Sequence, residues 1–248
     1  MAIRPVFCKN VGAKMPKILL TCQTIVLIIR LKMKSPVAAA DASHAETRRQ
    51  LLEAAGAVFA EFGFRNATVR AICRRAGANV AAVNYHFGDK ETLYAEVLRY
   101  AQGKALAKYP PLLDVAAGAP PEEKLRAFVK SFLLRIFDTG PTAWHGKLMS
   151  REMIEPTAAL DSLVDERMRP MASLLGQIVA GILDCPPSDE RVRLCAFSVV
   201  SQCVFYHHCR PVICRLFPQE APLDQADIAR LAEHITHFSL AAMKQLPK

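Results

Sequence analysis

A cluster of basic, amide and small side chains between residues 65 and 90 has the chemistry needed to bind nucleic acid. Basic groups pair with phosphates, asparagine can bond adenine edges, and alanine methyls can touch the thymine methyl. The cluster carries a net charge of +4, whereas all residues after 32 together carry only +3. Its charged members are Arg65, Arg70, Arg74, Arg75, Asp89 and Lys90, and the side chains expected to face outward are Asn79, Ala81, Ala82, Asn84, Tyr85 and His86.

A second set of reactive side chains, toward the C-terminus, could bind a metal. Cys203 and His207 would share one face of a helix, and a thiolate with an imidazole suits Zn or Cu. His208, Cys209 and Cys214 follow, but the eight cysteines include no CxxC pair. We therefore favour reduced cysteines that pack as small hydrophobes in a cytosolic protein, with no cofactor. A metal- or thiol-responsive site remains the alternative.

The sequence lacks the motifs of common enzymes. Neither GxSxG nor GxGxxG occurs, and the segment from Gly140 to Leu148 departs from the P-loop pattern in spacing and in its last residue. His145, Ser150 and Glu152 lie on one short segment with nothing to form an oxyanion hole. We therefore expect no enzymatic activity, and a helical enzyme or adaptor is the less favoured alternative.

Residues 128–153 combine apolar side chains with a few polar ones, as the wall of a small-molecule site does. The apolar members would form the wall, and the polar members would orient a ligand. Plain core packing of the same residues is the alternative. The expected pocket residues are Phe128, Phe132, Trp144, His145, Met149, Glu152 and Met153, with Arg151 as a further orienting group.

Helical periodicity predicts four helices in residues 45–104, which would position the nucleic-acid contacts. The first helix ends at Gly63, and Thr68 caps the second. A turn at residues 77–79 precedes the third helix, and Asp89 caps the fourth. Two short helices joined by such a turn form a helix-turn-helix, whose second helix enters the major groove. The residues expected to face inward are Leu51, Leu52, Ala55, Val58, Phe59, Phe62, Val69, Ile72, Cys73, Ala76, Val80, Val83, Phe87, Leu93, Val97, Tyr100 and Ala101.

The rest of the chain, residues 105–248, also predicts helices. A loose connection with four prolines at 105–121 separates it from the first domain. No alternating strand pattern appears, so the fold class is all-α, with an N-terminal three-helix helix-turn-helix domain followed by a helical ligand-binding and dimerisation domain. The expected helices span 122–138, 141–155, 157–183 with a kink at Pro170, 189–209 and 223–246, with a proline-containing connection at 211–222.

Two parts of the chain resemble known regulators. Within residues 47–94 the chain reads LLEAAGAVFAEFGF, then ATVRAICRRAG and then VNYHFGDKETLY. This segment resembles the DNA-binding domain of TetR-type transcriptional regulators. The resemblance implies phosphate contacts from Thr68, Tyr85, His86 and Lys90, and base contacts from Asn79, Ala81, Ala82 and Asn84.

The C-terminal part carries a looser resemblance. Residues 145–171 read HGKLMSREMIEPTAALDSLVDERMRPM, and residues 201–212 read SQCVFYHHCRPV. Both are similar to the C-terminal domain of CecR (YbiH)-like regulators. This implies a helical body that binds an effector and forms a homodimer through its last two long helices.

Residues 1–32 hold six basic residues and no acidic one. The apolar run at 18–29 is interrupted by polar residues and is shorter than the roughly 20 residues that span a bilayer. We expect translation to start at Met33 and residues 1–44 to be a disordered or mis-started extension, with a signal peptide or functional tail as alternatives.

Together these features predict a ligand-responsive, DNA-binding transcriptional regulator in the cytoplasm. We expect a repressor that binds a palindromic double-stranded DNA operator as a homodimer and is released by a small, largely apolar effector, with no membrane partner. The sequence does not distinguish a repressor from an activator.

Overall fold

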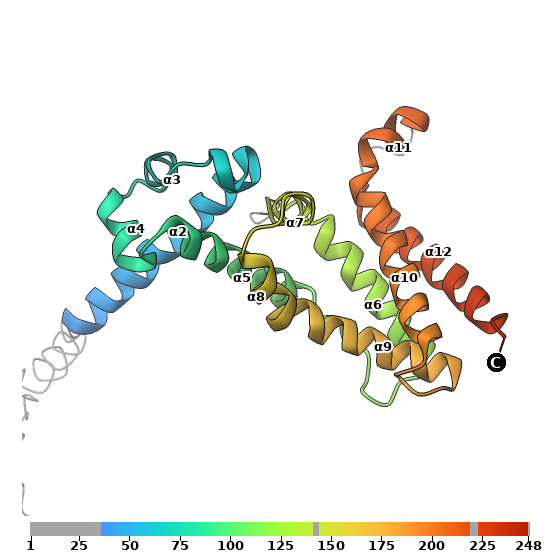
Figure 1. The fold of residues 1–248 in the computed structure, drawn as a ribbon. Coiled ribbons are helices and arrows are strands. Elements are labelled where there is room, and N and C mark those ends of the chain that lie inside the picture. The colour runs from blue at the N-terminus through green and yellow to red at the C-terminus, as the bar shows by residue number, and fades with distance from the viewer. Residues whose placement is uncertain (1–35, 141–143, 219–222, 248) are drawn as a thin grey trace, which may run out of the picture. The chain divides into compact units, whose positions relative to one another are not determined.

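The computed structural model describes residues 36–140, 144–218 and 223–247, with side chains from residue 41 onward. Contacts within the chain divide it into a part up to Thr47 and a unit from Arg48 onward. Over these ranges all regular elements are helical and no strand occurs (Figure 1). The helices are α2 (Pro36–Asn66), α3 (Val69–Ala76), α4 (Val80–Phe87), α5 (Lys90–Lys108), α6 (Pro121–Ile136), α7 (Trp144–Ile154), α8 (Ala159–Leu163), η1 (Val164–Met168), α9 (Arg169–Leu183), α10 (Glu190–His208), α11 (Arg210–Leu216) and α12 (Gln225–Lys244).

The expected helix-turn-helix forms from α3 and α4. Thr68 caps α3 by accepting a hydrogen bond from the Ala71 amide at 3.1 Å, and Asp89 caps α5 through the Thr92 amide at 2.7 Å. Gly77 ends α3 with a φ of 65°, in the left-handed region that side chains disfavour. The caps and glycines foreseen from the sequence therefore set the helix boundaries here.

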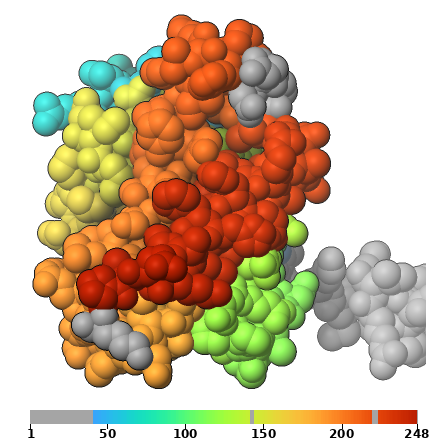
Figure 2. All heavy atoms as spheres, turned by 90° about the vertical axis from the view of Figure 1, so that its right-hand side faces the viewer, coloured from blue at the N-terminus to red at the C-terminus, as the bar shows by residue number. Residues whose placement is uncertain are grey.

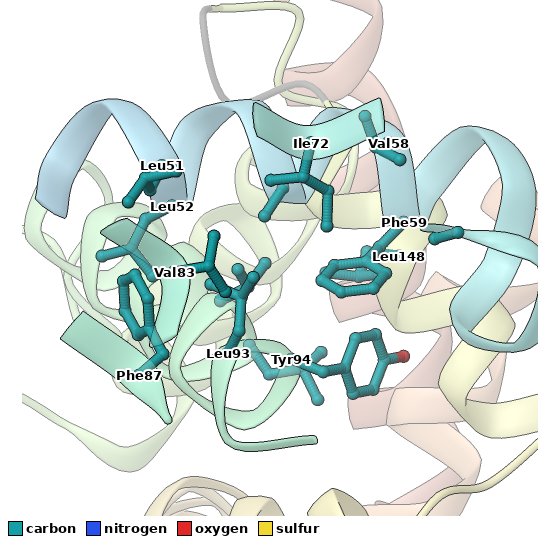
Figure 3. Packing of buried hydrophobic residues seen from close by; sticks show 14 of the residues in the cluster. Leu51, Leu52, Val58, Phe59, Ile72, Val83, Phe87, Leu93, Tyr94 and Leu148 are labelled. Atoms are coloured by element: carbon teal, nitrogen blue, oxygen red, sulfur yellow. The ribbon is translucent and has the colours of Figure 1, made fainter. Parts of the chain in front are cut away.

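One hydrophobic core joins α2, α3, α4 and α5 (Figure 3). Its buried members include most of the inward-facing residues expected from the helical periodicity. Two expectations are wrong: Phe62 is 47% exposed, next to the break in the helix at Gly63, and Val80 is 41% exposed in the first turn of α4. Leu148 of α7 also lies in this core, so the core includes a helix from the C-terminal part of the chain.

The boundaries of the first domain differ from those expected. Residues 36–44 belong to α2, which therefore begins within the stretch expected to be a disordered or mis-started extension. Residues 36–44 contain four alanines, the residue with the highest helix propensity. Helix α5 continues to Lys108, beyond the expected boundary at 104. The expectations for Met33 and the tail before residue 36 lie outside the described residues.

A second core lies between α6, α9, α10 and α12. Leu125 and Leu133 of α6, Val179 of α9 and Ile235 of α12 are fully buried. The kink expected at Pro170 takes the form of one π-helical turn, η1, before α9. In this turn the Arg169 amide donates to the Val164 carbonyl, so the helix passes a residue that has no amide hydrogen.

The connection expected at 211–222 contains a further helix, α11, with proline near its start, where the missing amide hydrogen costs no helical hydrogen bond. After it, Asp224 and Asp227 form a capping box at the start of α12. Figure 2 shows α12 in red, with α10 and α11 in orange beside it. In the described part of the chain, no helix is both long and apolar enough to cross a membrane.

Candidate nucleic-acid interface and ligand cavity

Helix α4 presents most of the side chains expected to contact base edges. Asn84 and Tyr85 are exposed, Tyr85 by 71%, whereas Ala82 and His86 are half-buried. Ala81 is also exposed. Asn79 is exposed, but its amide oxygen accepts the Ala81 backbone N–H at 3.1 Å and caps the helix. While it caps α4, Asn79 cannot offer both its oxygen and its nitrogen to adenine, so Asn84 is the better placed amide for that contact.

The basic side chains of the cluster surround α3 and α4. Arg65, Arg70, Arg74 and Arg75 are exposed. Lys90 is half-buried, with its ammonium 4.6 Å from the Phe64 ring centroid and 3.4 Å from the Arg65 carbonyl oxygen.

Thr68 and Lys90 stand at the N-termini of α3 and α5, where helix dipoles and free amides favour an anion. Phosphate contacts from these two residues remain a prediction.

A cavity of about 600 Å³ lies between α5, α6, α7, α9 and α10. Its volume is in the range of sites for drug-sized ligands. Five of the seven expected pocket residues line it: Phe128, Phe132, His145, Met149 and Met153.

Trp144 and Glu152, also expected in the pocket, do not line this cavity. Because successive helix residues point about 100° apart, α7 directs His145 and Met149 into the cavity and Trp144 toward α2. The Trp144 ring lies against Gly56 of α2, so closely that a methyl group added there would be 2.4 Å from its Cη2 atom.

Glu152 is completely buried. Its carboxylate accepts hydrogen bonds from the Tyr94 hydroxyl of α5 at 2.6 Å, from the Thr157 amide at 2.9 Å and from the Thr157 hydroxyl at 3.0 Å. Burial, and then the bond to Glu152, raises the pKa of Tyr94. Glu152 therefore links α7 to the helix-turn-helix domain.

Arg151, expected as a polar group of the pocket, also points away from the cavity. Its guanidinium donates to the carbonyl oxygens of Ala60 and Glu61, both at 3.0 Å. These carbonyls precede the break in α2 at Gly63, where helical partners for backbone oxygens run out. Arg151 therefore caps the first helix of the DNA-binding domain from α7.

The cavity also has polar residues that sequence analysis missed, namely Arg135, Arg167 and His207. Neither ring nitrogen of His145, both buried, has a hydrogen-bond partner. Burial and the nearby charge of Arg135 lower the pKa of His145 to about 4, so its ring is neutral at pH 7. Arg135, His145, Arg167 and His207 come from four separate helical segments, and their spacing in the sequence does not predict that they line one cavity.

The residues considered for a metal site do not form one. Cys203 is buried, and burial raises the pKa of its thiol to about 12, which disfavours the thiolate that metals bind. Across residues 36–140, 144–218 and 223–247, no group of three or more His, Cys, Asp or Glu side chains is arranged to hold a metal ion.

Comparison with known proteins identifies the N-terminal and the C-terminal part of the chain separately. Residues 51–97 match the family of bacterial regulatory proteins called the tetR family. The HTH-type transcriptional dual regulator CecR of Shigella flexneri is 30% identical over 166 residues, which cover 63% of this chain and 74% of that protein. The repressor KstR2 of Mycobacterium tuberculosis is 40% identical over 86 residues, 34% of this chain and 42% of that protein.

The fold is also found among solved structures. The crystal structure of AibR in complex with isovaleryl coenzyme A and operator DNA has a TM-score of 0.59 and 16% sequence identity, over 77% of this chain and 97% of that one. These findings define a helix-turn-helix transcriptional regulator and not an enzyme.

Residues 121–243 match the C-terminal domain of the dual regulator CecR. The chain thus belongs to the TetR family and carries a C-terminal domain of the CecR type.

Proposed function

We propose that this regulator is a homodimeric repressor that binds a palindromic operator and is released by a small, largely apolar effector. The observation that carries this proposal is the position of α7 between the cavity and the DNA-binding domain. One face of α7 places His145 and Met149 in the cavity wall. Another face buries Leu148 in the core of the helix-turn-helix domain. A ligand that displaces α7 must therefore disturb that domain.

Hydrogen bonds from α7 connect the cavity to particular helices of the DNA-binding domain. Arg151 holds the end of the first helix, and Glu152 holds Tyr94 of α5, the helix after the recognition helix. An effector that favours a different position of α7 would shift the population toward dimers whose recognition helices no longer match successive major grooves. Because linkage is reciprocal, operator DNA would weaken effector binding by the same factor.

The exposed apolar side chains of α10 and α12 support the proposed homodimer. Two such helices from each copy would bury them in a four-helix bundle, and a two-fold dimer reads a palindrome. Figure 2 shows the face of α12 with α10 beside it. The exposed apolar residues of these two helices and of the turn after α12 are Leu194, Phe197, Phe205, Phe238 and Leu246.

The names of similar proteins support the same reading. KstR2 is described as a repressor, and AibR was crystallised with both an acyl-coenzyme A and operator DNA. A regulator that binds an operator works where the chromosome is, so we propose a cytoplasmic location.

Selection of binding sites from random duplex DNA tests the DNA-binding part of the proposal. A palindromic site should emerge, and the logarithm of its affinity should fall with the logarithm of salt concentration with a slope of roughly −4 to −8. Lys90→Ala should weaken all DNA alike, whereas Asn84→Ala should cost about 1–3 kcal/mol on the selected site only. Affinity that is independent of salt, or no common site, would contradict the proposal.

Fluorescence of Trp144, the only tryptophan of the chain, can be used to follow the release of operator DNA by effectors. Its ring contacts α2 and not the cavity, so its emission reports movement between α7 and α2. Compounds that release the operator should change this emission, and Arg151→Met should reduce the release. Release by Zn or Cu that is lost in Cys203→Ser would favour the metal-responsive alternative.

A further inference from the structure

The polar side chains of the cavity are basic or neutral, without an acidic one among the described residues that line it. Arg135 and Arg167 supply two positive charges, and neither lies within an ion-pair distance of a carboxylate in the described part of the chain. Arg135 is only 8% exposed and donates to two neutral oxygens, the Tyr109 carbonyl and the Ser131 hydroxyl. Burial lowers the pKa of Arg135 to about 10, as expected for a cation without a counter-ion.

Arg135, His145 and His207 line the cavity close to one another. The charge of Arg135 and the ring of His207 both lower the pKa of His145, and His207 Nε2 would be 3.1 Å from a methyl group at Gly146. The neutral His145 ring has one N–H donor and one acceptor, and both are buried without a partner. The acidic group that most affects His145 is Asp138, which is already paired with Lys108 at 2.6 Å.

Apolar side chains make up most of the rest of the wall. Phe128, Phe132, Met149, Met153 and Met171 provide aromatic and thioether surface without charge. Methionine side chains adapt to ligands of different shape. The cavity is therefore amphiphilic, with a basic cluster around Arg135 and His145 set in a mainly apolar wall.

On the basis of the effector release proposed above, we infer that the effector is an amphiphilic organic anion. Its apolar part lies among the phenylalanines and methionines, and its carboxylate or similar head accepts hydrogen bonds from Arg135 and His145. The head group supplies the counter-ion that Arg135 lacks and a partner for the His145 N–H. Charged hydrogen bonds in a buried site are stronger than neutral ones, so the anionic head should dominate selectivity between ligands with the same apolar body.

A matched pair of fluorescent probes tests this inference on the full chain. 8-Anilino-1-naphthalenesulfonate and N-phenyl-1-naphthylamine share an aromatic body and differ by the anionic group. Titration of the unmodified protein should give an affinity at least about tenfold higher for the sulfonate. Decanoate should displace the bound sulfonate probe at concentrations about tenfold lower than decanol does.

Variants locate the anion. His145→Leu and Arg135→Met should each remove most of the preference for the anionic probe and leave affinity for the neutral probe within about threefold. Arg169→Gln is the matched control, because Arg169 is exposed, pairs with Asp165 and does not line the cavity. If Arg135→Met fails to fold, the probe affinities of His145→Leu alone test where the anionic group binds. Equal affinity for the two probes, or a preference that survives His145→Leu, overturns the inference.

Operator release is measured separately, by anisotropy of labelled DNA from the site selection. Release by decanoate but not by decanol supports the inference. Equal release by both compounds overturns it while leaving the proposed regulatory function intact. Absence of sequence-specific DNA binding would instead remove the proposed function, and the probe titration would still report the selectivity of the cavity.

Discussion

Tyr94→Phe removes a single oxygen atom from the contact between α7 and the DNA-binding domain. The Tyr94 ring packs edge-on against Phe59 with centroids 4.9 Å apart, and phenylalanine keeps this packing. Only the 2.6 Å hydrogen bond to Glu152 is lost. Glu152 is completely buried, so water cannot replace the missing donor without opening the core.

The expected loss in the free energy of unfolding is about 2–3 kcal/mol, the range for a hydrogen bond to a charged group that is left buried. Tyr100→Phe provides the matched control, because the Tyr100 hydroxyl donates to Glu53 at 2.8 Å. The Glu53 side chain is 39% exposed, so water can take the place of the hydroxyl there. For this control we expect a loss of about 0.5–1 kcal/mol.

Urea unfolding of both variants, followed by circular dichroism, measures the difference between these losses. A smaller loss in Tyr94→Phe than in Tyr100→Phe would refute the argument that burial of Glu152 sets the cost. The same variants should differ in function, since only Tyr94→Phe weakens a bond between α7 and α5. Effector release of the operator should therefore need higher effector concentrations in Tyr94→Phe and not in Tyr100→Phe.

Three further predictions concern single sites. Because the pKa of His145 lies near 4 instead of 6.5, the unfolded chain takes up a proton first as pH falls. Stability should thus be full above pH 6.5 and drop by about 3 kcal/mol by pH 4, a drop that urea melts of His145→Phe should lack. Gly77→Ala should cost about 1–2 kcal/mol at its positive φ, whereas Gly103→Ala, helical with open space around it, should stabilise by about 1 kcal/mol in the same assay. Gly56→Ala should shift Trp144 emission and lower the melting temperature, because its methyl group would meet the ring; unchanged emission would contradict that packing.

Much of the DNA-binding domain could be predicted from local sequence. Thr68 and Asp89 cap helices because their side chains reach amides three residues ahead, and Gly77 ends α3 because it adopts a positive φ without strain. Periodic apolar residues such as Phe59 and Ile72 identify the inward faces. Capping, the glycine helix end and apolar periodicity each depend on residues within one or two helical turns, so a short stretch of sequence is enough to predict them.

Only the tertiary structure decides which neighbour each side of α7 contacts. The segment is apolar on both sides, because Met149 faces a cavity and Leu148 faces a core. Periodicity does not tell which neighbour covers each side, so it did not indicate that Trp144 contacts α2 or that Glu152 is buried away from the cavity.

The basic cluster of the cavity likewise depends on where the helices pack. Arg135, His145 and His207 come from α6, α7 and α10, and each stands in a helix whose local pattern is ordinary. Sequence alone determined the all-helical class, the capped helix ends of the DNA-binding domain and the family. The convergence of these polar groups, and the hydrogen bonds of Arg151 and Glu152, depend on contacts between residues tens of positions apart, which short-range propensities do not encode.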